Sequence, residues 1–163
     1  MTGRAKGSGP ISELGRRAQE ITQTIVEGCG IQGKALVVED SAARIIVEVV
    51  TPEAGLFIGT QGEMLNAVQI LVRAITTTAN TERIPIVVDC QGYRSRREET
   101  LREQAESLAR QVKESGKEAV LEGLSAYERR VIHVTLAEDK SVVTYSEGEG
   151  SHRHLVVSPS EEH

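Results

Sequence analysis

The residues with the clearest chemical potential form a short segment bracketed by glycines, Gly59-Thr60-Gln61-Gly62. It lies between two short apolar runs that predict a helix on either side. Glycine has no Cβ, so the backbone of another molecule can approach such a turn closely. N–H groups at the turn and at the start of the next helix can hold a phosphate. The segment is a candidate binding loop, although two glycines at this spacing are common in proteins.

A second candidate group lies in the C-terminal part of the chain. Arg129 and His133 are four residues apart, so a helix would place them on one face with Arg130 beside them. A guanidinium and an imidazole offer donors to a phosphate or a base edge. Arg153 and His154 would join this surface if their strand packs beside the helix. The ordinary alternative is an exposed arginine and an unrelated surface histidine.

Three arginines, Arg94, Arg96 and Arg97, open a long predicted helix. Positive charge at a helix N-terminus opposes the helix dipole, which leaves an anionic ligand as one reason for them. We therefore expect them, together with His154, to be accessory nucleic-acid contacts. The glutamates farther along the same helix are better explained as a solvated face with ion pairs one turn apart.

Composition narrows the classes of function. The chain has 163 residues and a net charge of −5, from 19 basic and 24 acidic residues, so it is not built to bind duplex by bulk charge. Aromatic residues make up only 2%, which disfavours a base-stacking platform. No apolar run reaches the ~20 residues of a membrane helix, and Met1 to Pro10 lacks the apolar core of a signal peptide. Cys29 and Cys90 form no CxxC pair, which favours reduced, structural thiols in a cytoplasm.

The N-terminal half predicts six elements that position the glycine loop. A helix capped by Ser12 has an apolar face and is ended by Gly28 and Gly30. Strands are predicted at 35–39, 44–50 and 84–88, and Pro85 suggests that the last lies at a sheet edge. A short helical turn begins at Pro52, and a longer helix follows the loop. The apolar faces of the two longer helices are predicted to be Leu14, Ala18, Ile21 and Ile25, and Leu65, Val68, Val72 and Ile75.

The C-terminal half predicts two helices and a hairpin. The long helix runs from Arg94 to about Ser115, and a capping box at Ser125 starts the helix that carries Arg129. A short piece at 118–121 separates them. Strands at 141–145 and 154–158 are joined by a glycine-rich turn. The apolar faces are predicted to be Leu101, Ala105, Leu108 and Val112, and Tyr127, Val131 and Val134.

The first six elements follow the order α-β-β-α-α-β, which resembles the type II KH fold. That fold places a GxxG loop between adjacent helices and uses it to hold single-stranded RNA. The second half resembles the small domain family named for its Arg-x-x-x-His motif, the R-3-H domain, with helices packed on a small sheet. We expect an α+β protein with a flexible tail at 1–10, a KH domain at 11–91, an R-3-H domain at 92–160 and a tail at 161–163.

The linker Gly92-Tyr93-Arg94-x-Arg96-Arg97-Glu98 joins the two halves, and the pairing resembles the bacterial Jag family, also called KhpB or SpoIIIJ-associated protein. The resemblance implies a cytoplasmic RNA-binding regulator linked to cell elongation and division, with a small single-KH protein, KhpA, as a partner. It implies single-stranded RNA as ligand, with single-stranded DNA as the second candidate, and no membrane insertion. Relatives often carry Lys or Arg inside the loop, where this chain has Thr60 and Gln61. Relatives also often have an extra N-terminal domain and a basic linker, which we do not find in this sequence.

Two rival functions compete with this interpretation. An enzyme is disfavoured because there is no HExxH motif, no cysteine ligand cluster and no P-loop lysine, so we expect no metal, no cofactor and no catalytic residue. A protein-interaction module that kept a KH fold but lost strong affinity for RNA is the alternative. The acidic net charge and the neutral loop support that alternative.

Overall fold

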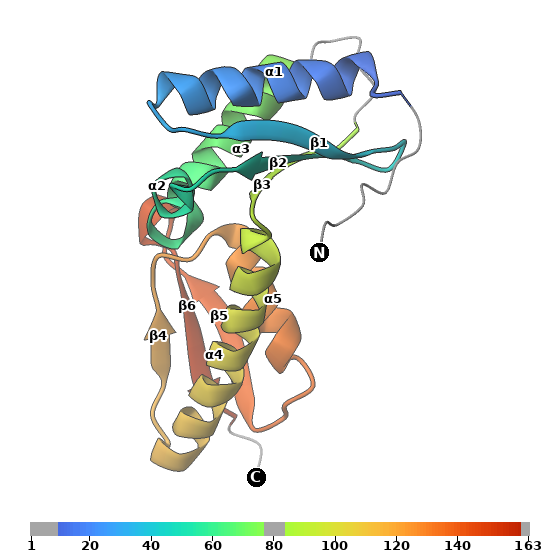
Figure 1. Ribbon diagram of the computed structural model, residues 1–163. Coiled ribbons are helices and arrows are strands. Elements are labelled where there is room, and N and C mark those ends of the chain that lie inside the picture. Colours follow the sequence, from blue (N-terminus) through green and yellow to red (C-terminus); the bar gives the residue numbers. More distant parts are fainter. Residues whose placement is uncertain (1–9, 77–83, 161–163) are drawn as a thin grey trace. The chain divides into compact units, whose positions relative to one another are not determined.

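The structure is a computed structural model that describes residues 10–76 and 84–160 (Figure 1). Most of the predicted N-terminal tail and the tail at 161–163 lie outside the described residues. The chain divides into two compact units, Met1–Arg94 and Ser95–His163. Among the helices that the structure describes, none is long and apolar enough to cross a membrane.

The first unit has the predicted order of elements. They are α1 (Glu13–Gly28), β1 (Lys34–Asp40), β2 (Ile45–Val50), α2 (Ala54–Ile58), the short 3-10 helix η1 (Thr60–Gly62), α3 (Glu63–Thr76) and β3 (Ile86–Cys90). The Ser12 hydroxyl accepts the Gly15 N–H and so caps α1, as predicted. β3 begins two residues later than expected. Pro85 lacks an N–H, and its carbonyl accepts the N–H of Ile45 just before the strand begins.

The sheet of the first unit is mixed. Its order is β1-β2-β3, with β1 and β2 antiparallel and β2 and β3 parallel. β3 is an edge strand of this sheet, as the proline suggested. Parallel neighbours require a crossover connection, which α2, η1 and α3 supply here. The glycine loop is therefore part of the crossover rather than of a surface hairpin.

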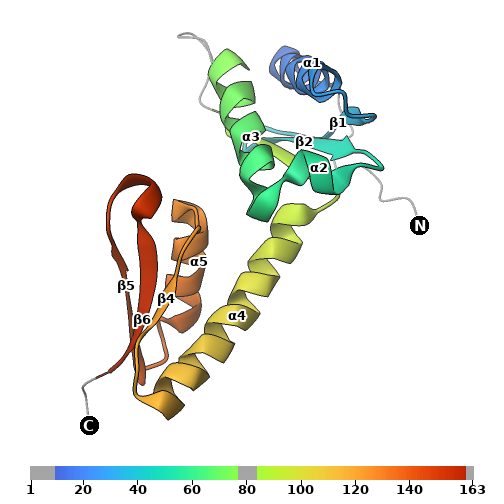
Figure 2. The ribbon, with the colours of Figure 1, turned by 90° about the vertical axis from the view of Figure 1, so that its left-hand side faces the viewer.

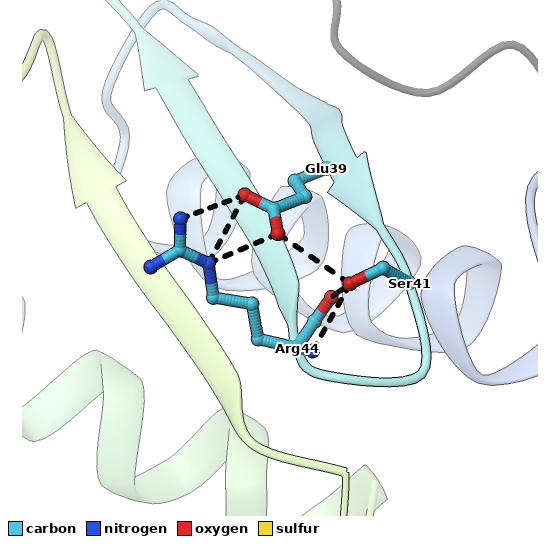
Figure 3. Close-up of polar contacts among 3 residues, drawn as sticks. All are labelled: Glu39, Ser41 and Arg44. Atoms are coloured by element: carbon cyan, nitrogen blue, oxygen red, sulfur yellow. Dashed lines mark hydrogen bonds and ion pairs between the residues drawn. The ribbon is translucent and has the colours of Figure 1, made fainter.

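The β1–β2 hairpin is closed by polar contacts at its tip (Figure 3). The Arg44 guanidinium lies 2.9 Å from a carboxylate oxygen of Glu39, and the Ser41 hydroxyl donates to the Arg44 carbonyl at 3.1 Å. Arg44 is exposed and Glu39 is only partly buried, so the ion pair adds little to stability. They lie at the turn between the strands predicted at 35–39 and 44–50.

One face of this sheet forms the core with the helices. Alternate residues of β2 and β3 are buried, and α1, α2 and α3 cover them; the members include Ile45, Val47, Val49, Ile86, Val88, Cys90, Ala18, Phe57, Leu65, Val68 and Val72. The predicted face of α3 is wrong at its end, because Ile75 is half exposed and Thr76 is buried instead. In α1, Leu14, Ile21 and Ile25 pack at the margin of the core rather than at its centre. Cys90 lies in the core, whereas Cys29, expected to be structural, is exposed.

The second unit packs helices on one side of a small sheet (Figure 2). Its elements are α4 (Tyr93–Ser115, which begins in the first unit), β4 (Ala119–Leu121), α5 (Ala126–Leu136), β5 (Val142–Glu147), the 3-10 helix η2 (Gly150–His152) and β6 (His154–Pro159). The sheet order is β4-β6-β5 and both pairings are antiparallel. The predicted hairpin of β5 and β6 is confirmed, and β4 adds a third strand.

In the second unit, the buried faces of α4 and α5 differ in part from the predicted faces. Leu101, Ala105 and Val112 are buried as expected, but Ala109 takes the place of Leu108. On α5, Val131 is buried while Tyr127 is 61% and Val134 is 66% exposed. The buried residues of α5 are Glu128, Val131, Ile132 and Leu136. Hydrophobic spacing predicts only apolar residues as buried. It therefore assigned Tyr127 to the buried face in place of the carboxylate of Glu128.

Candidate nucleic-acid interface

The glycine loop lies at the junction of α2 and α3, and both glycines need the conformations that glycine allows. Gly59 has φ +73° and Gly62 has φ +85°, values that side chains with a Cβ rarely adopt. A Cβ on Gly59 would lie 2.8 Å from Cβ of Met64, and one on Gly62 would lie 2.8 Å from Cε1 of Tyr93. Gln61 is also left-handed, with φ 51°. Thus the loop is a specific structure and not merely a small turn.

Internal hydrogen bonds occupy several N–H groups of the loop. Gly59 donates to the Gly55 carbonyl at 2.9 Å, and Gly62 donates to the Gly59 carbonyl at 3.4 Å. The N–H of Glu63 is directed to the Thr60 carbonyl. Thr60 and Gln61 are exposed and Gly62 is buried. A ligand would therefore meet the outer side of the loop at these two neutral residues, which leaves a narrower set of backbone donors than the sequence suggested.

One residue of the linker lies against this loop, and the next contacts the helix that follows it. Tyr93 is close enough to Gly62 to exclude a Cβ there. Arg94 donates to the Val88 carbonyl at 2.9 Å, to Asn66 Oδ1 at 3.0 Å and to Gln69 Oε1 at 3.0 Å. Arg94, predicted to be an accessory nucleic-acid contact, is thus engaged within the first unit. These partners give it a reason to stand at the helix start without an anionic ligand.

The helix that carries Arg129 and His133 begins at a complete capping box. The Ser125 hydroxyl accepts the Glu128 N–H, and the Glu128 carboxylate accepts the Ser125 N–H. Glu128 also accepts a hydrogen bond from Nε of Arg97 at 2.8 Å, and both side chains are largely buried. Arg97, like Arg94, therefore has an internal role. The ion pair fixes the start of α5 against α4.

His133 faces two hydroxyls on β5. Its Nδ1 lies 2.7 Å from Oγ1 of Thr144, and its Nε2 lies 3.4 Å from Oγ of Ser146. Arg129 donates to the Leu124 carbonyl at 2.7 Å, which holds its guanidinium near the start of the helix. The structure thus joins the predicted pair to two hydroxyl residues that sequence reasoning missed.

Electrostatics favour a neutral imidazole at this position. Partial burial lowers the pKa of His133 below its usual 6.5, and the neighbouring Arg129 guanidinium lowers it further. The imidazole is then able to exchange hydrogen bonds with the Thr144 and Ser146 hydroxyls in either sense. A phosphate placed beside Arg129 would oppose both effects and favour the charged ring.

The other residues predicted to join Arg129 and His133 do not all lie beside them. Arg130 and Arg153 are exposed. His154 is paired across the sheet with Glu147, its Nε2 lying 4.0 Å from that carboxylate. His154 and Glu147 stand opposite each other on one face of the sheet, whereas Ser146 belongs to the alternate positions that face His133. The structure therefore does not bring His154 onto the His133 face.

A signal for the missed hydroxyls is present in the sequence. Val142, Thr144 and Ser146 alternate along β5 with Val143 and Tyr145, and a strand places alternate residues on one face. Since Val142 is buried, the same face must carry Thr144 and Ser146 toward α5. Within residues 10–76 and 84–160, no group of three His, Cys, Asp or Glu side chains is arranged to hold a metal ion.

Comparison with known proteins identifies a domain in the C-terminal part of the chain and relatives that match most of the chain. A family model described as the R-3-H domain matches residues 99–159, which include Arg129, His133, Thr144 and Ser146. RNA-binding protein KhpB of Bacillus subtilis is 36% identical over 146 residues, covering 88% of this chain and 69% of the relative. The chain belongs to the KhpB family. Its members from Clostridium symbiosum and Lactiplantibacillus plantarum are each 39% identical, over 106 and 108 residues.

Coverage of these KhpB relatives is unequal. The matched part spans 65% of this chain and 48% of the C. symbiosum protein, and 66% of this chain and 34% of the L. plantarum protein. This chain thus accounts for about half or less of those two relatives. The match to the B. subtilis protein extends over most of both units.

Proposed function

We propose that this chain binds single-stranded RNA through the loop of a type II KH domain at 11–91 and the Arg129/His133 surface of an R-3-H domain at 92–160. The observation that carries the proposal is the loop itself: two glycines with positive φ at a helix junction, with Thr60 and Gln61 exposed between them. Such a loop admits a sugar–phosphate backbone. The element order, the mixed sheet and the name of the relatives, RNA-binding protein KhpB, support it.

At the second surface, the proposal assigns phosphate or base-edge contacts to Arg129 and His133, with Arg130 and Arg153 as further cations. Arg130 and Arg153 are exposed, so they can contact the phosphates of a flexible RNA strand. Arg96 and His154 remain accessory candidates. We leave Arg94 and Arg97 out of the contact set because their guanidiniums have partners within their own units.

The cellular role we propose is that of a cytoplasmic regulator acting after transcription, tied to bacterial cell elongation and division. Neither catalysis nor a cofactor forms part of the proposal. Single-stranded DNA is the second ligand to test. The 2′-hydroxyl distinguishes RNA from DNA, so a direct comparison of the two strands tests the assignment.

The loop is best tested without changing its glycines. An aspartate at Gly59 or Gly62 would add strain at positive φ as well as charge, so a loss of binding would be ambiguous. Thr60→Asp with Gln61→Asp adds two charges on the exposed side, and aspartate tolerates the left-handed region better than most residues. Binding of the full chain to a short single-stranded RNA should weaken at least about tenfold by fluorescence anisotropy.

The matched control is Thr60→Asn with Gln61→Asn, which has nearly the same shape and no charge. It should stay within about twofold of the wild type. Equal binding by the aspartate and asparagine variants would overturn the loop assignment. Combining the aspartates with Arg129→Ala should give additive losses if the two surfaces act separately.

A specific observation also favours a protein partner. The exposed side of α3 carries an apolar stripe at helical spacing, beside the exposed Arg73: Ala67, Ile70, Leu71, Ala74 and Ile75. Ile70 is 67% exposed and Leu71 and Ile75 are each 50% exposed. Such stripes usually pack against another helix. We propose it as the surface for a KhpA-like single-KH protein, and as the main site if the alternative of an interaction module is correct.

The partner proposal is tested by Leu71→Asp with Ile75→Asp. Sedimentation of the chain with a purified single-KH protein should lose the complex, while RNA binding by the chain alone is retained. The control Glu63→Gln changes an exposed residue of α3 outside the stripe and should leave the complex intact. A complex that survives the double change would remove the stripe from consideration.

A further inference from the structure

We propose that Tyr93 and Arg94 are positioning residues that hold the glycine loop in its RNA-binding conformation. The inference rests on the proposed function, because it explains how the binding loop is kept in shape. It assigns the first two residues of α4 to the first unit, in agreement with the division after Arg94. It also separates them from the nucleic-acid contacts that the sequence suggested for this arginine-rich start.

Tyr93 fills the space beneath the second glycine. An ideal Cβ on Gly62 would lie 2.8 Å from Cε1 and 3.1 Å from the hydroxyl oxygen of Tyr93. Real Cβ atoms do not approach aromatic carbons this closely. The ring therefore lies directly on the Cα of Gly62 and accounts for the burial of that residue, while Thr60 and Gln61 stay exposed.

The turn that delivers Tyr93 is itself tightly held. Gln91 and Gly92 are both left-handed, with φ 51° and 68°, and a non-glycine residue stays in that region only where its surroundings impose it. The surroundings do so here. The Gln91 amide donates to the Thr51 carbonyl at 2.7 Å, and the Gly92 N–H donates to a Glu48 carboxylate oxygen at 3.2 Å.

Arg94 ties α3, the helix that follows the loop, to β3. Its guanidinium bridges the Val88 carbonyl on β3 to Asn66 and Gln69 on α3. Gln69 Oε1 also accepts the Val88 N–H at 3.1 Å. Asn66 and Gln69 stand one to two turns beyond the loop, so this network fixes the direction in which α3 leaves Gly62. Arginine suits the position because its planar group reaches several acceptors at once.

These contacts have a consequence for binding. A loop that is already held in its binding conformation loses little conformational entropy when it binds a phosphate. If removal of the Tyr93 ring leaves only about a fifth of the molecules with the competent loop, the apparent Kd rises about fivefold. The fold need not be lost, since Tyr93 lies at the margin of the core.

The first experiment compares Tyr93→Leu, Tyr93→Phe and Arg94→Lys in the full chain. Affinity for a short single-stranded RNA is measured by anisotropy, and the backbone amide resonances of Thr60 and Gln61 are recorded by NMR without RNA. Tyr93→Leu and Arg94→Lys should weaken binding about fivefold and shift or broaden both loop resonances. Tyr93→Phe keeps the ring and should stay closer to the wild type than Tyr93→Leu in both measurements.

A double-mutant cycle tests the contact directly. Gly62→Ala should weaken binding because its Cβ meets Tyr93, and part of that loss should be recovered when Tyr93→Leu is added. Gly59→Ala serves as the matched control, since its Cβ meets Met64 instead. Adding Tyr93→Leu to Gly59→Ala should recover nothing.

The outcomes separate the inference from the proposed function. Unchanged loop resonances in Tyr93→Leu, or full additivity of Gly62→Ala and Tyr93→Leu, would overturn the positioning role. A wild-type chain that binds no single-stranded RNA would overturn the proposed function instead. The resonances are recorded without RNA, so they decide the positioning role in either case.

Discussion

The two candidate surfaces of this chain are built in opposite ways. The loop at 59–62 consists of backbone in unusual conformations and two neutral exposed side chains. The surface on α5 consists of ordinary helical backbone and side chains held by specific partners, with Arg129 on the Leu124 carbonyl and His133 on two hydroxyls. We therefore expect RNA binding at the loop to depend on shape, and RNA binding at the α5 surface to depend on charge and hydrogen bonds.

This difference teaches how each surface must be probed. Changing a glycine of the loop alters backbone strain, so it reports on conformation more than on the ligand. Changing Arg129 or His133 removes a donor but also disturbs the contacts that orient it. Each surface therefore needs variants that alter one property and keep the other.

The largest expected effect concerns the framework of the second surface. Glu128 is 7% exposed and joins Arg97 to the capping box of α5. Glu128→Ala should lower the free energy of unfolding by about 3 kcal/mol, because it removes the buried carboxylate that Arg97 binds together with half of the cap. Urea denaturation measures this. Glu106→Ala, at an exposed site on α4, should change it by less than about 0.5 kcal/mol.

Next in size is the loss of the oriented arginine. Arg129→Ala should weaken binding to single-stranded RNA about tenfold, the usual worth of a charge-assisted contact. Arg130→Ala removes the same charge from an exposed neighbour and should cost about threefold or less. Anisotropy at one fixed salt concentration compares them. Equal losses would mean that this surface depends on charge alone, which would erase the contrast with the loop.

A smaller effect should follow when charge is added to the loop. Gln61→Lys should strengthen RNA binding about threefold at about 0.1 M salt and steepen the dependence of log K on log salt by about 0.7. Gln61→Met adds no charge at the same left-handed position and should change neither quantity. A salt slope that stays constant in the lysine variant would show that no phosphate lies near residue 61.

The smallest effect is a pH dependence of stability. The pKa of His133 is lowered in the folded chain, first by burial and then by Arg129. The unfolded chain then binds more protons below about pH 6.5, so this contribution to stability is complete above that pH and is lost as the pH falls. His133→Gln should reduce the drop in unfolding free energy between about pH 7 and about pH 5.5. His154→Gln is the control, and an equal response from both would exclude a special role for His133.

Local features of the fold could be predicted from the sequence. The order of elements, the cap at Ser12, the capping box at Ser125 and the hairpin of β5 and β6 follow from short-range rules. Which side of each helix is buried was harder to predict. Ile75 and Val134 fit an apolar spacing but face outward, because the partner surface, and not the spacing, selects which ridge is buried.

The candidate sites show the same limit. Glycine spacing predicted a loop between two helices, and the i,i+4 rule predicted that Arg129 and His133 share one helix face. Thr144 and Ser146 were missed because their role depends on how β5 lies beside α5. The partners of Arg94 and Arg97 come from α3 and α5, which are distant in sequence, so the arginine-rich helix start suggested a ligand where the structure shows internal bonds.

The contact between Tyr93 and Gly62 also bears on how this protein should be divided for experiments. A fragment that ends at Gln91, the boundary that the sequence suggested, would contain every strand of the first sheet and both glycines. It would lack the ring under Gly62 and the guanidinium that ties β3 to α3. Such a fragment would underestimate the contribution of the loop, whereas one extended past Arg94 would retain it. During synthesis on the ribosome, the loop emerges before Tyr93 and Arg94, so at that stage it also lacks the residues that support it.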